Sequence, residues 1–554
     1  MKQSTMIMAV SSLLAGGCTS GFLDLSPMND LRADAVFSDP ALVEAFVNAA
    51  YGEGVRHGFW RNRDISVVGL SGDVRHTHWY GTEEFAKGRT TPDNGENATG
   101  NLWRDSYRVI RNINTFFANI EGSPLEQERK AQLIAEMQFI RAWVYADLVR
   151  WYGGVPLIDE VLTTRDTQRF HAIARSTYDE VVARIVGDLD AAIAVLPPTR
   201  NGGKATGIAA MALKSRVLLY AASLLNNPLN DPGKWIAAHD ATRAAIDALG
   251  DQALHPDYGE VFLSVTTETL WARYFVGGGT GQGHIVNLSN NPNGHNGWGG
   301  NTPLQALVDA YDMSNGLPIT DPASGYDPQN PYVNRDPRFY ATINFNGAMW
   351  KGRPIETFNG GLDTKEGPVQ HWNGTHTGYY TRKYLDESAP ISETIKSTTP
   401  WPFFRKAELY LNYAETLLAL GDEVNAKIWM NKTRARAGMP DIALESGPAL
   451  VERYRQERRV ELAIEGHRFF DILRWKIAEH VLAGPARGVT ITIGPGGVPV
   501  YDYETKDPIP GRSFDPTKHY RMPIPRSEID KAPMLLQNPG YGCGEQGQPP
   551  CFSP

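Results

Sequence analysis

The chain has 554 residues, of which 42% are hydrophobic and 21% are charged, and this balance is typical of a globular protein. Its length suits either one large domain or two. The formal net charge of -8 argues against nucleic acid as a partner, because nucleic-acid binding needs a basic surface.

The first residues predict a secretory signal that ends at a lipidation site. Lys2 precedes an apolar run that is too short to cross a bilayer as a helix, which takes about 20 residues. Small residues then stand directly before Cys18, which resembles the lipobox of bacterial lipoproteins, although Ala15 holds the position where leucine is usual. We expect a signal peptide over 1–17, acylation of Cys18, and an anchor and tether over 18–30. An ordinary signal peptide that contains a cysteine is the alternative.

The clearest helix signal begins at Ser123. Ser123-Pro124-Leu125-Glu126 has the pattern of a capping box with proline at the first helical position. Apolar residues then recur at helical spacing as far as Trp151, and Gly153 ends the helix. A second helix is predicted from Ser176 to Val195.

Later segments read as two pairs of helices. In the second pair Gly421 makes the turn and Ala426 follows five positions later, which resembles the small residue of a tetratricopeptide-type repeat that permits close helix crossing. The pattern predicts a mainly α-helical scaffold of stacked, irregular helix pairs. The predicted helices are 207–225 with 234–249, and 404–420 with 426–436.

Between about 256 and 400 the helical pattern gives way to glycine- and asparagine-rich sequence. A loop region this long in a compact protein is usually functional or disordered. Its many tryptophan and tyrosine residues argue against disorder. We therefore expect an ordered, functional insertion, punctuated by glycines such as Gly277–Gly279.

Short motifs occur in order along nearly the whole chain. They are Phe22–Pro27, Trp103–Tyr107, Ile110–Asn114, Ala135–Ala142, Trp151–Leu157, Asn431–Pro440, Glu457–Asp471, Pro523–Pro525 and Gln537–Tyr541. Each motif alone is weakly specific, but the ordered set resembles the SusD/RagB family of outer-membrane lipoproteins from glycan-using bacteria.

The resemblance implies one SusD-like, mainly α-helical domain over 31–554. Its tetratricopeptide-like scaffold is expected at about 31–255 and 400–480, its loop-rich insertion at about 256–399, and a C-terminal segment at 481–554. The resemblance also implies a place on the cell surface and a TonB-dependent, SusC-like outer-membrane transporter as the partner. It implies an oligo- or polysaccharide ligand that is bound without cleavage and without a cofactor.

A charged run late in the chain looks catalytic. Its members fall at three- and four-residue steps, so they are predicted to share one helix face. Two carboxylates could serve a glycosidase, but arginines on the same helix would keep both ionised, whereas a general acid needs a raised pKa. We expect an internal ion-pair network and no catalytic residue. The members are Arg458, Glu461, Glu465 and Arg468.

Other catalytic or metal-binding signals are weak. His76 and His78 offer two imidazoles without a visible third ligand, so no metal site is predicted. The sequence holds no nucleophile elbow, zinc-protease helix or phosphate loop. Cys543 and Cys551 lie close together, and they either form a short bridge or stay reduced.

A sugar-binding site needs flat aromatic side chains for the C–H faces of the rings and polar groups for the hydroxyls. Two aromatic loops qualify, at 73–81 and 295–299, and two tryptophans of the insertion are outlying candidates. The candidate residues are Asp73, Arg75, Trp79, Tyr80, His295, Asn296, Trp298, Trp350 and Trp372.

These features favour a surface lipoprotein that binds glycan for a transporter and catalyses nothing. Three alternatives stay open: a binding protein for peptide or glycopeptide import, a surface glycoside hydrolase, and a purely structural helical scaffold. The last explains the helix pairs but gives the lipobox and the aromatic insertion no role.

Overall fold

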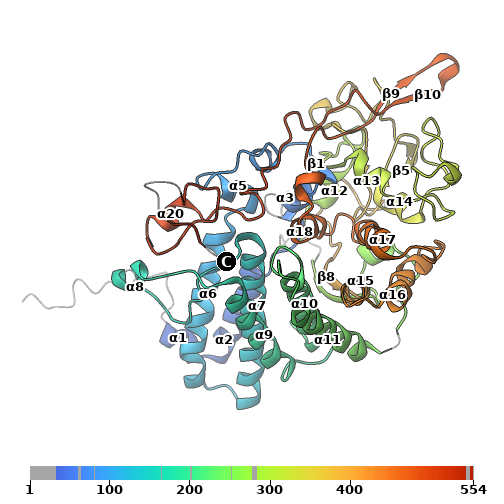
Figure 1. Cartoon of the computed structure of the whole chain (residues 1–554). Coiled ribbons are helices and arrows are strands. Elements are labelled where there is room, and N and C mark those ends of the chain that lie inside the picture. Colours follow the sequence, from blue (N-terminus) through green and yellow to red (C-terminus); the bar gives the residue numbers. More distant parts are fainter. Residues whose placement is uncertain are drawn as a thin grey trace, which may run out of the picture.

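A computed structural model describes residues 33–59, 64–79, 81–163, 165–199, 202–250, 252–276, 283–544 and 550–552. The predicted signal peptide, Cys18, the tether, Tyr80 and Gly277–Gly279 lie outside these residues. The described chain is mainly helical, and its strands are short and pair in twos (Figure 1). Within these ranges, none of the helices combines the length and apolar character that spanning a bilayer requires.

Helices of the N-terminal half pack around α7 (Gln127–Tyr152), which contacts helices on several sides (Figure 1). The α7 helix ends at Gly153, which has a φ of 77°, as predicted. Its predicted start at Ser123 was wrong, because Glu126 takes an extended conformation as the N-cap and the helix begins at Gln127. The other helices of this half are α1 (Ala33–Phe37), α2 (Pro40–Gly54), α3 (Asp64–Gly69), α4 (Glu83–Ala86), α5 (Gly95–Thr99), α6 (Leu102–Asn119), α8 (Thr167–His171) and α9 (Tyr178–Ile193).

The α9 helix confirms the second predicted helix and adds a cap that the sequence analysis missed. The Thr177 side chain accepts a hydrogen bond from the backbone N–H of Glu180, and the Glu180 carboxylate accepts one from the backbone N–H of Thr177. This reciprocal capping box satisfies two N–H groups that a helix start leaves open.

The predicted helix pairs are confirmed. The helices α10 (Gly207–Ala222) and α11 (Pro232–Leu249) pack together, as do α15 (Lys406–Ala419) and α16 (Glu423–Arg436). Gly421 makes the second turn with a φ of 85°, and Ala426 is fully buried where the helices meet. The chain continues through α17 (Gly447–Glu461), α18 (Arg468–Arg474) and α19 (Ala478–Val481).

The insertion is ordered but built from short elements. Its two ends are held together by the antiparallel pairing of β2 (Thr269–Arg273) with β8 (Trp401–Arg405). This pairing fixes the intervening loops against the helical scaffold. Those loops contain α12 (Val286–Asn290), β3 (Asn301–Pro303), α13 (Gln305–Asp309), α14 (Pro337–Thr342), β4 (Ile343–Asn344), β5 (Met349–Trp350), β6 (Arg353–Pro354) and β7 (Tyr380–Thr381).

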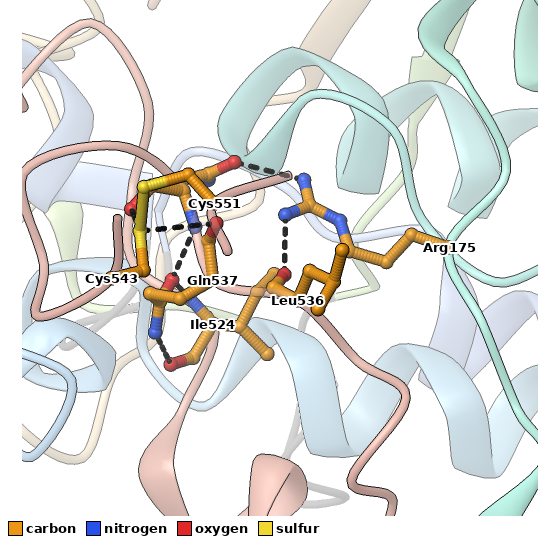
Figure 2. The surroundings of a disulfide bond; sticks show 7 residues. Arg175, Ile524, Leu536, Gln537, Cys543 and Cys551 are labelled. Atoms are coloured by element: carbon orange, nitrogen blue, oxygen red, sulfur yellow. Dashed lines mark hydrogen bonds between the residues drawn. A yellow bond between two sulfur atoms is a disulfide. The ribbon is translucent and has the colours of Figure 1, made fainter. Parts of the chain in front are cut away.

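The C-terminal segment forms a hairpin of β9 (Thr490–Ile493) and β10 (Pro499–Asp502), then returns across the molecule to α20 (Arg526–Ile529) beside the N-terminal helices (Figure 1). A Cys543–Cys551 disulfide is formed near its end. Around it the Arg175 guanidinium donates to the Leu536 carbonyl at 2.9 Å (Figure 2). The disulfide closes a short loop within the C-terminal segment, and the Arg175 contact ties that segment to the loop before α9.

Candidate functional site

The two predicted aromatic loops form one surface. The strand β1 (Val74–His76) pairs antiparallel with β3, and Arg75 lies opposite Thr302. Beyond the pairing, the Thr77 N–H donates to the Gly300 carbonyl at 3.0 Å. Loop 73–79 and loop 291–300 therefore lie side by side, although more than 200 residues of sequence separate the paired strands.

A third loop, 363–376, joins them. The Asn373 side-chain oxygen lies 2.9 Å from His78 Nε2, and the Gln370 amide donates to the Asn296 side-chain oxygen at 3.3 Å. Trp372 lies between these two contacts in sequence, and 60% of its surface is exposed. We call the surface made by loops 73–79, 291–300 and 363–376 the loop face.

The loop that carries Trp298 is fixed by backbone hydrogen bonds to the region of α12. The Trp298 N–H donates to the Leu288 carbonyl at 2.8 Å, and the Gly300 N–H donates to the Ser289 carbonyl at 2.7 Å. Asn296 takes a left-handed conformation, with a φ of 63°, and turns the chain before Trp298. These contacts hold the half-buried Trp298 side chain in a defined position at the surface.

A buried amide and hydroxyl pair ties the loop of Trp372 to the loop of Trp298. The Asn293 side chain donates to the Thr364 carbonyl at 3.0 Å and accepts a hydrogen bond from the Tyr380 hydroxyl at 2.6 Å. The same hydroxyl contacts the Asp363 carbonyl at 3.0 Å. Because these polar groups are buried and bonded to one another, they fix the two loops relative to each other.

Trp350 does not belong to this surface. Only 1% of its side chain is exposed, and its indole N–H donates to the Asn291 side chain at 2.7 Å. A sugar ring has no access to its face, so we withdraw Trp350 as a stacking candidate. It supports the base of the Trp298 loop.

Asp73 and Arg75 are also withdrawn as groups that contact a ligand. Asp73 is buried and accepts a hydrogen bond from Arg459 Nε at 2.9 Å. Arg75 is buried and donates to the Pro508 carbonyl at 2.6 Å, with its guanidinium 4.6 Å from the centre of a Trp79 ring. Both side chains position the strand and the loop that carry Trp79.

The remaining candidates stay at or near the surface. Asn296 is exposed, whereas His295 and Trp79 are half-buried, and burial lowers the pKa of His295. Sequence reasoning missed Gln370, His371 and Asn373 as polar members of the loop face, and it gave His78 no role in binding. The polar residues flanking Trp372 were the signal that could have found the first three, because they repeat the pattern around Trp298.

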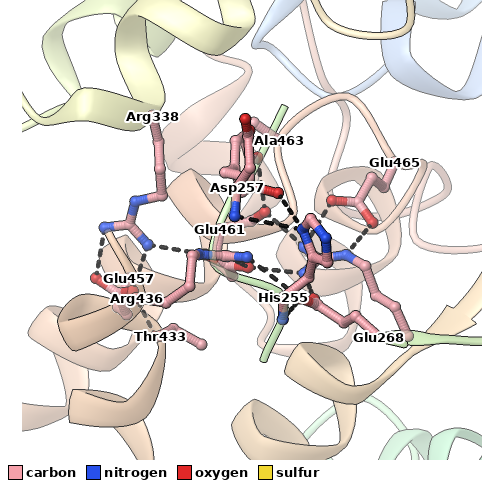
Figure 3. Close-up of polar contacts among 12 residues, drawn as sticks. His255, Asp257, Glu268, Arg338, Thr433, Arg436, Glu457, Glu461, Ala463 and Glu465 are labelled. Atoms are coloured by element: carbon pink, nitrogen blue, oxygen red, sulfur yellow. Dashed lines mark hydrogen bonds and ion pairs between the residues drawn. The ribbon is translucent and has the colours of Figure 1, made fainter. Parts of the chain in front are cut away.

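The charged run forms an internal network, as predicted, but with other partners (Figure 3). The α17 helix ends at Glu461, so Glu465 and Arg468 do not continue its face. Glu461 instead accepts hydrogen bonds from Arg405 and Arg338 at 2.7 and 2.9 Å. Burial opposes ionisation of Glu461, but the surrounding guanidinium groups outweigh it and hold its pKa well below the usual range.

Other carboxylates of the network are also bonded to cationic side chains. Glu465 accepts hydrogen bonds from Lys383 and Arg405 at 2.8 and 2.7 Å, whereas Arg458 donates to Asp471 at 2.9 Å. Burial raises the pKa of Glu465, but the charges of Arg405 and Lys383 outweigh burial and lower it, which is the opposite of what a general acid needs. Within the described residues, no group of three or more acidic, histidine or cysteine side chains is placed to hold a metal.

Comparison with known proteins identifies relatives over nearly the whole chain. Residues 267–541 match the family described as the SusD family, and residues 21–219 match the description "Starch-binding associating with outer membrane". A SusD-like protein of Formosa agariphila is 25% identical over 570 residues, which span 98% of this chain and 100% of that protein.

Solved structures share the fold. A SusD-like protein from Bacteroides fragilis has a TM-score of 0.77 and 28% identity, covering 93% of this chain and 100% of its own. A SusD-like carbohydrate-binding protein from the same species has a TM-score of 0.76 and 26% identity, covering 90% of this chain and 99% of its own.

Proposed function

This chain belongs to the SusD family, and on that basis we propose that it is a glycan-binding lipoprotein of the outer membrane that captures oligo- or polysaccharide through its loop face. The observation that carries the proposal is the hydrogen bond between Gln370 and Asn296, which joins the loops of Trp372 and Trp298. Two surface indoles with amide groups beside them supply both kinds of contact that a sugar needs.

The ligand class is supported by a relative as well as by this chemistry. The second Bacteroides fragilis structure is titled a carbohydrate-binding protein. Some SusD-like proteins that share only the fold bear similar titles, among them a laminarin-binding protein with 22% identity. Acylation of Cys18 would anchor the chain at the membrane, and we propose a TonB-dependent, SusC-like transporter as the recipient of the glycan.

We propose that binding occurs without cleavage. The buried carboxylates of the charged network are bonded to arginines and lysines, so none is poised to protonate a glycosidic oxygen. On the loop face, Asp363 is buried and paired with Arg353 at 2.7 Å.

The test is affinity electrophoresis of the chain truncated after Cys18 through gels that contain a panel of plant, fungal and microbial polysaccharides. We expect one glycan to retard the protein without releasing products. The variants Trp298→Ala and Trp372→Ala should each weaken retention about 5- to 150-fold, because stacking and burial of one indole contribute on the order of 1–3 kcal/mol.

Tyr274→Ala is the matched control, since it removes a partly exposed aromatic ring outside the loop face, beside Gly203. Equal retention of both tryptophan variants and wild type would place the site elsewhere. Cleavage products would identify a hydrolase, and absence of retention by every glycan would make peptide cargo the better hypothesis.

A further inference from the structure

One side of the loop face carries a group of cations. Lys365 Nζ lies 3.3 Å from Nδ1 and 3.4 Å from Nε2 of His376. Burial, followed by the charges of Arg75, Lys365, Lys506 and His78, lowers the pKa of His376 to about 3. The imidazole is therefore neutral near neutral pH and can accept a hydrogen bond from Lys365. These charges come from separate segments of the chain and act on one side chain of the loop face.

These cations are bonded to neutral groups. Arg75 donates to the Pro508 and His76 carbonyls at 2.6 and 2.9 Å, and Lys506 Nζ lies 3.3 Å from the Val489 carbonyl. Among the ion pairs that the structure gives for the described residues, none involves Arg75, Lys365 or Lys506. Burial lowers the pKa of Lys365 and Lys506, as expected for ammonium groups that have lost water without gaining a bonded carboxylate.

The acidic groups that act on these cations form no ion pair with them among the described residues. Glu83 acts on Arg75 from a distance, but it already accepts a hydrogen bond from Lys87 at 2.7 Å. Glu366 acts on both Lys365 and Lys506 from a distance, and within the described residues neither lysine forms an ion pair with it. A local excess of positive charge therefore remains, on a chain whose formal net charge is -8.

Arg75 and Lys365 share loops with the side chains proposed to stack on sugars, and Lys506 acts on the same imidazole from outside these loops. The Arg75 guanidinium lies 4.6 Å from the centre of a Trp79 ring, and His78 contacts Asn373, the residue next to Trp372. Lys365 and His376 belong to the same loop as Trp372. An anionic substituent on a bound sugar ring would thus lie within reach of an ammonium group.

We propose that the loop face selects anionic saccharides, in which a carboxylate or sulfate group of the glycan contacts Lys365 and Lys506 while a neighbouring ring stacks on tryptophan. This inference rests on the glycan-binding function proposed above and names its substrate class. Screening limits the effect of distant charges to about 8 Å at physiological salt, so the local cations decide the contact and not the negative net charge.

The test compares matched polymers that differ only in charge. Polygalacturonate is compared with its carboxyl-reduced neutral form, and dextran sulfate with dextran, by affinity electrophoresis at low and high salt. We expect at least one anionic member to bind about tenfold more tightly than its neutral counterpart, with a preference that shrinks as salt rises. The pair that shows the preference tells whether the anionic group is a carboxylate or a sulfate ester.

The double variant Lys365→Gln with Lys506→Gln should remove this preference while retention by a neutral glycan is unchanged. Lys427→Gln is the control, because this lysine lies on α16, away from the loop face, and donates to the Ala443 carbonyl at 2.9 Å. Equal binding of charged and neutral members, or a preference that survives the double variant, overturns the selection of anions and leaves glycan binding standing. Absence of binding by every polymer, charged or neutral, overturns both proposals.

Discussion

Glu461 is fully buried, and both of its carboxylate oxygens accept hydrogen bonds from guanidinium groups. It lies where α17 ends, and the arginines that reach it come from β8, α14 and α16. A single carboxylate therefore links the helical scaffold to the insertion that carries the loop face. Its role is in folding, because every oxygen is already engaged.

We predict that Glu461→Gln destabilises the fold by about 3–5 kcal/mol, because the substitution removes a negative charge that the buried guanidinium groups need as a partner. Chemical denaturation of both proteins measures the loss. Glu452→Gln is the control: this glutamate is exposed and pairs with Arg455 on the same helix, so its substitution should cost less than about 1 kcal/mol. Similar midpoints for Glu461→Gln and wild type would show that the network contributes little to stability.

At the element scale, Gly297 allows the loop of Trp298 to turn close to its own base. A Cβ at this position would lie 2.1 Å from the Asn291 carbonyl oxygen, so the backbone must shift to accept any side chain. Asn291 also accepts the hydrogen bond of the Trp350 indole. The buried Trp350 therefore supports the loop that carries Trp298 at the surface.

We predict that Gly297→Ala weakens glycan retention about as much as Trp298→Ala, because it displaces Trp298 from its place beside the other loops. Affinity electrophoresis gives the retention, and circular dichroism checks that the helical content is unchanged. Gly187→Ala in α9 is the matched control: its Cβ would meet open space, and we expect a gain of roughly 0.5–1 kcal/mol in stability. Unchanged retention in Gly297→Ala would mean that the loop adapts without moving its tryptophan.

The helices could be predicted from the sequence because their signals are local. Apolar residues at helical spacing indicate where the helices run. Gly153 and Gly421 mark where two of them end. The joining of the loops could not be predicted, because β1 pairs with a strand more than 200 residues away. Trp350 misled the sequence analysis for the same reason: it lies in the loop-rich insertion, whereas it is buried and bonded to Asn291, a distant partner.

At the scale of the whole molecule, several imidazoles are buried without charge. Burial lowers the pKa of His284 from 6.5 to about 4, and it holds the pKa of His467 well below its usual value. Below pH 6.5 the unfolded chain binds protons at these positions that the folded chain does not bind. Each group therefore makes the folded state less stable as the pH falls.

We predict that the free energy of unfolding decreases as pH falls from about 6.5 towards 4, by up to about 1.4 kcal/mol per pH unit for each such histidine. Thermal unfolding across this range measures the slope. His284→Asn cannot take up the proton and should flatten the curve, whereas the exposed His171→Gln should not. A slope that His284→Asn leaves unchanged would assign the pH dependence to other groups.

The division between the helical scaffold and the loop face has an evolutionary consequence. The groups that hold the fold together, such as Glu461 and the arginines bonded to it, lie inside, whereas Trp298, Trp372 and Lys365 stand on loops at the surface. Substitutions at the loop tips can therefore accumulate without endangering the architecture. A few mutations in the loops can therefore change which ligand the protein binds while the rest of the protein stays the same.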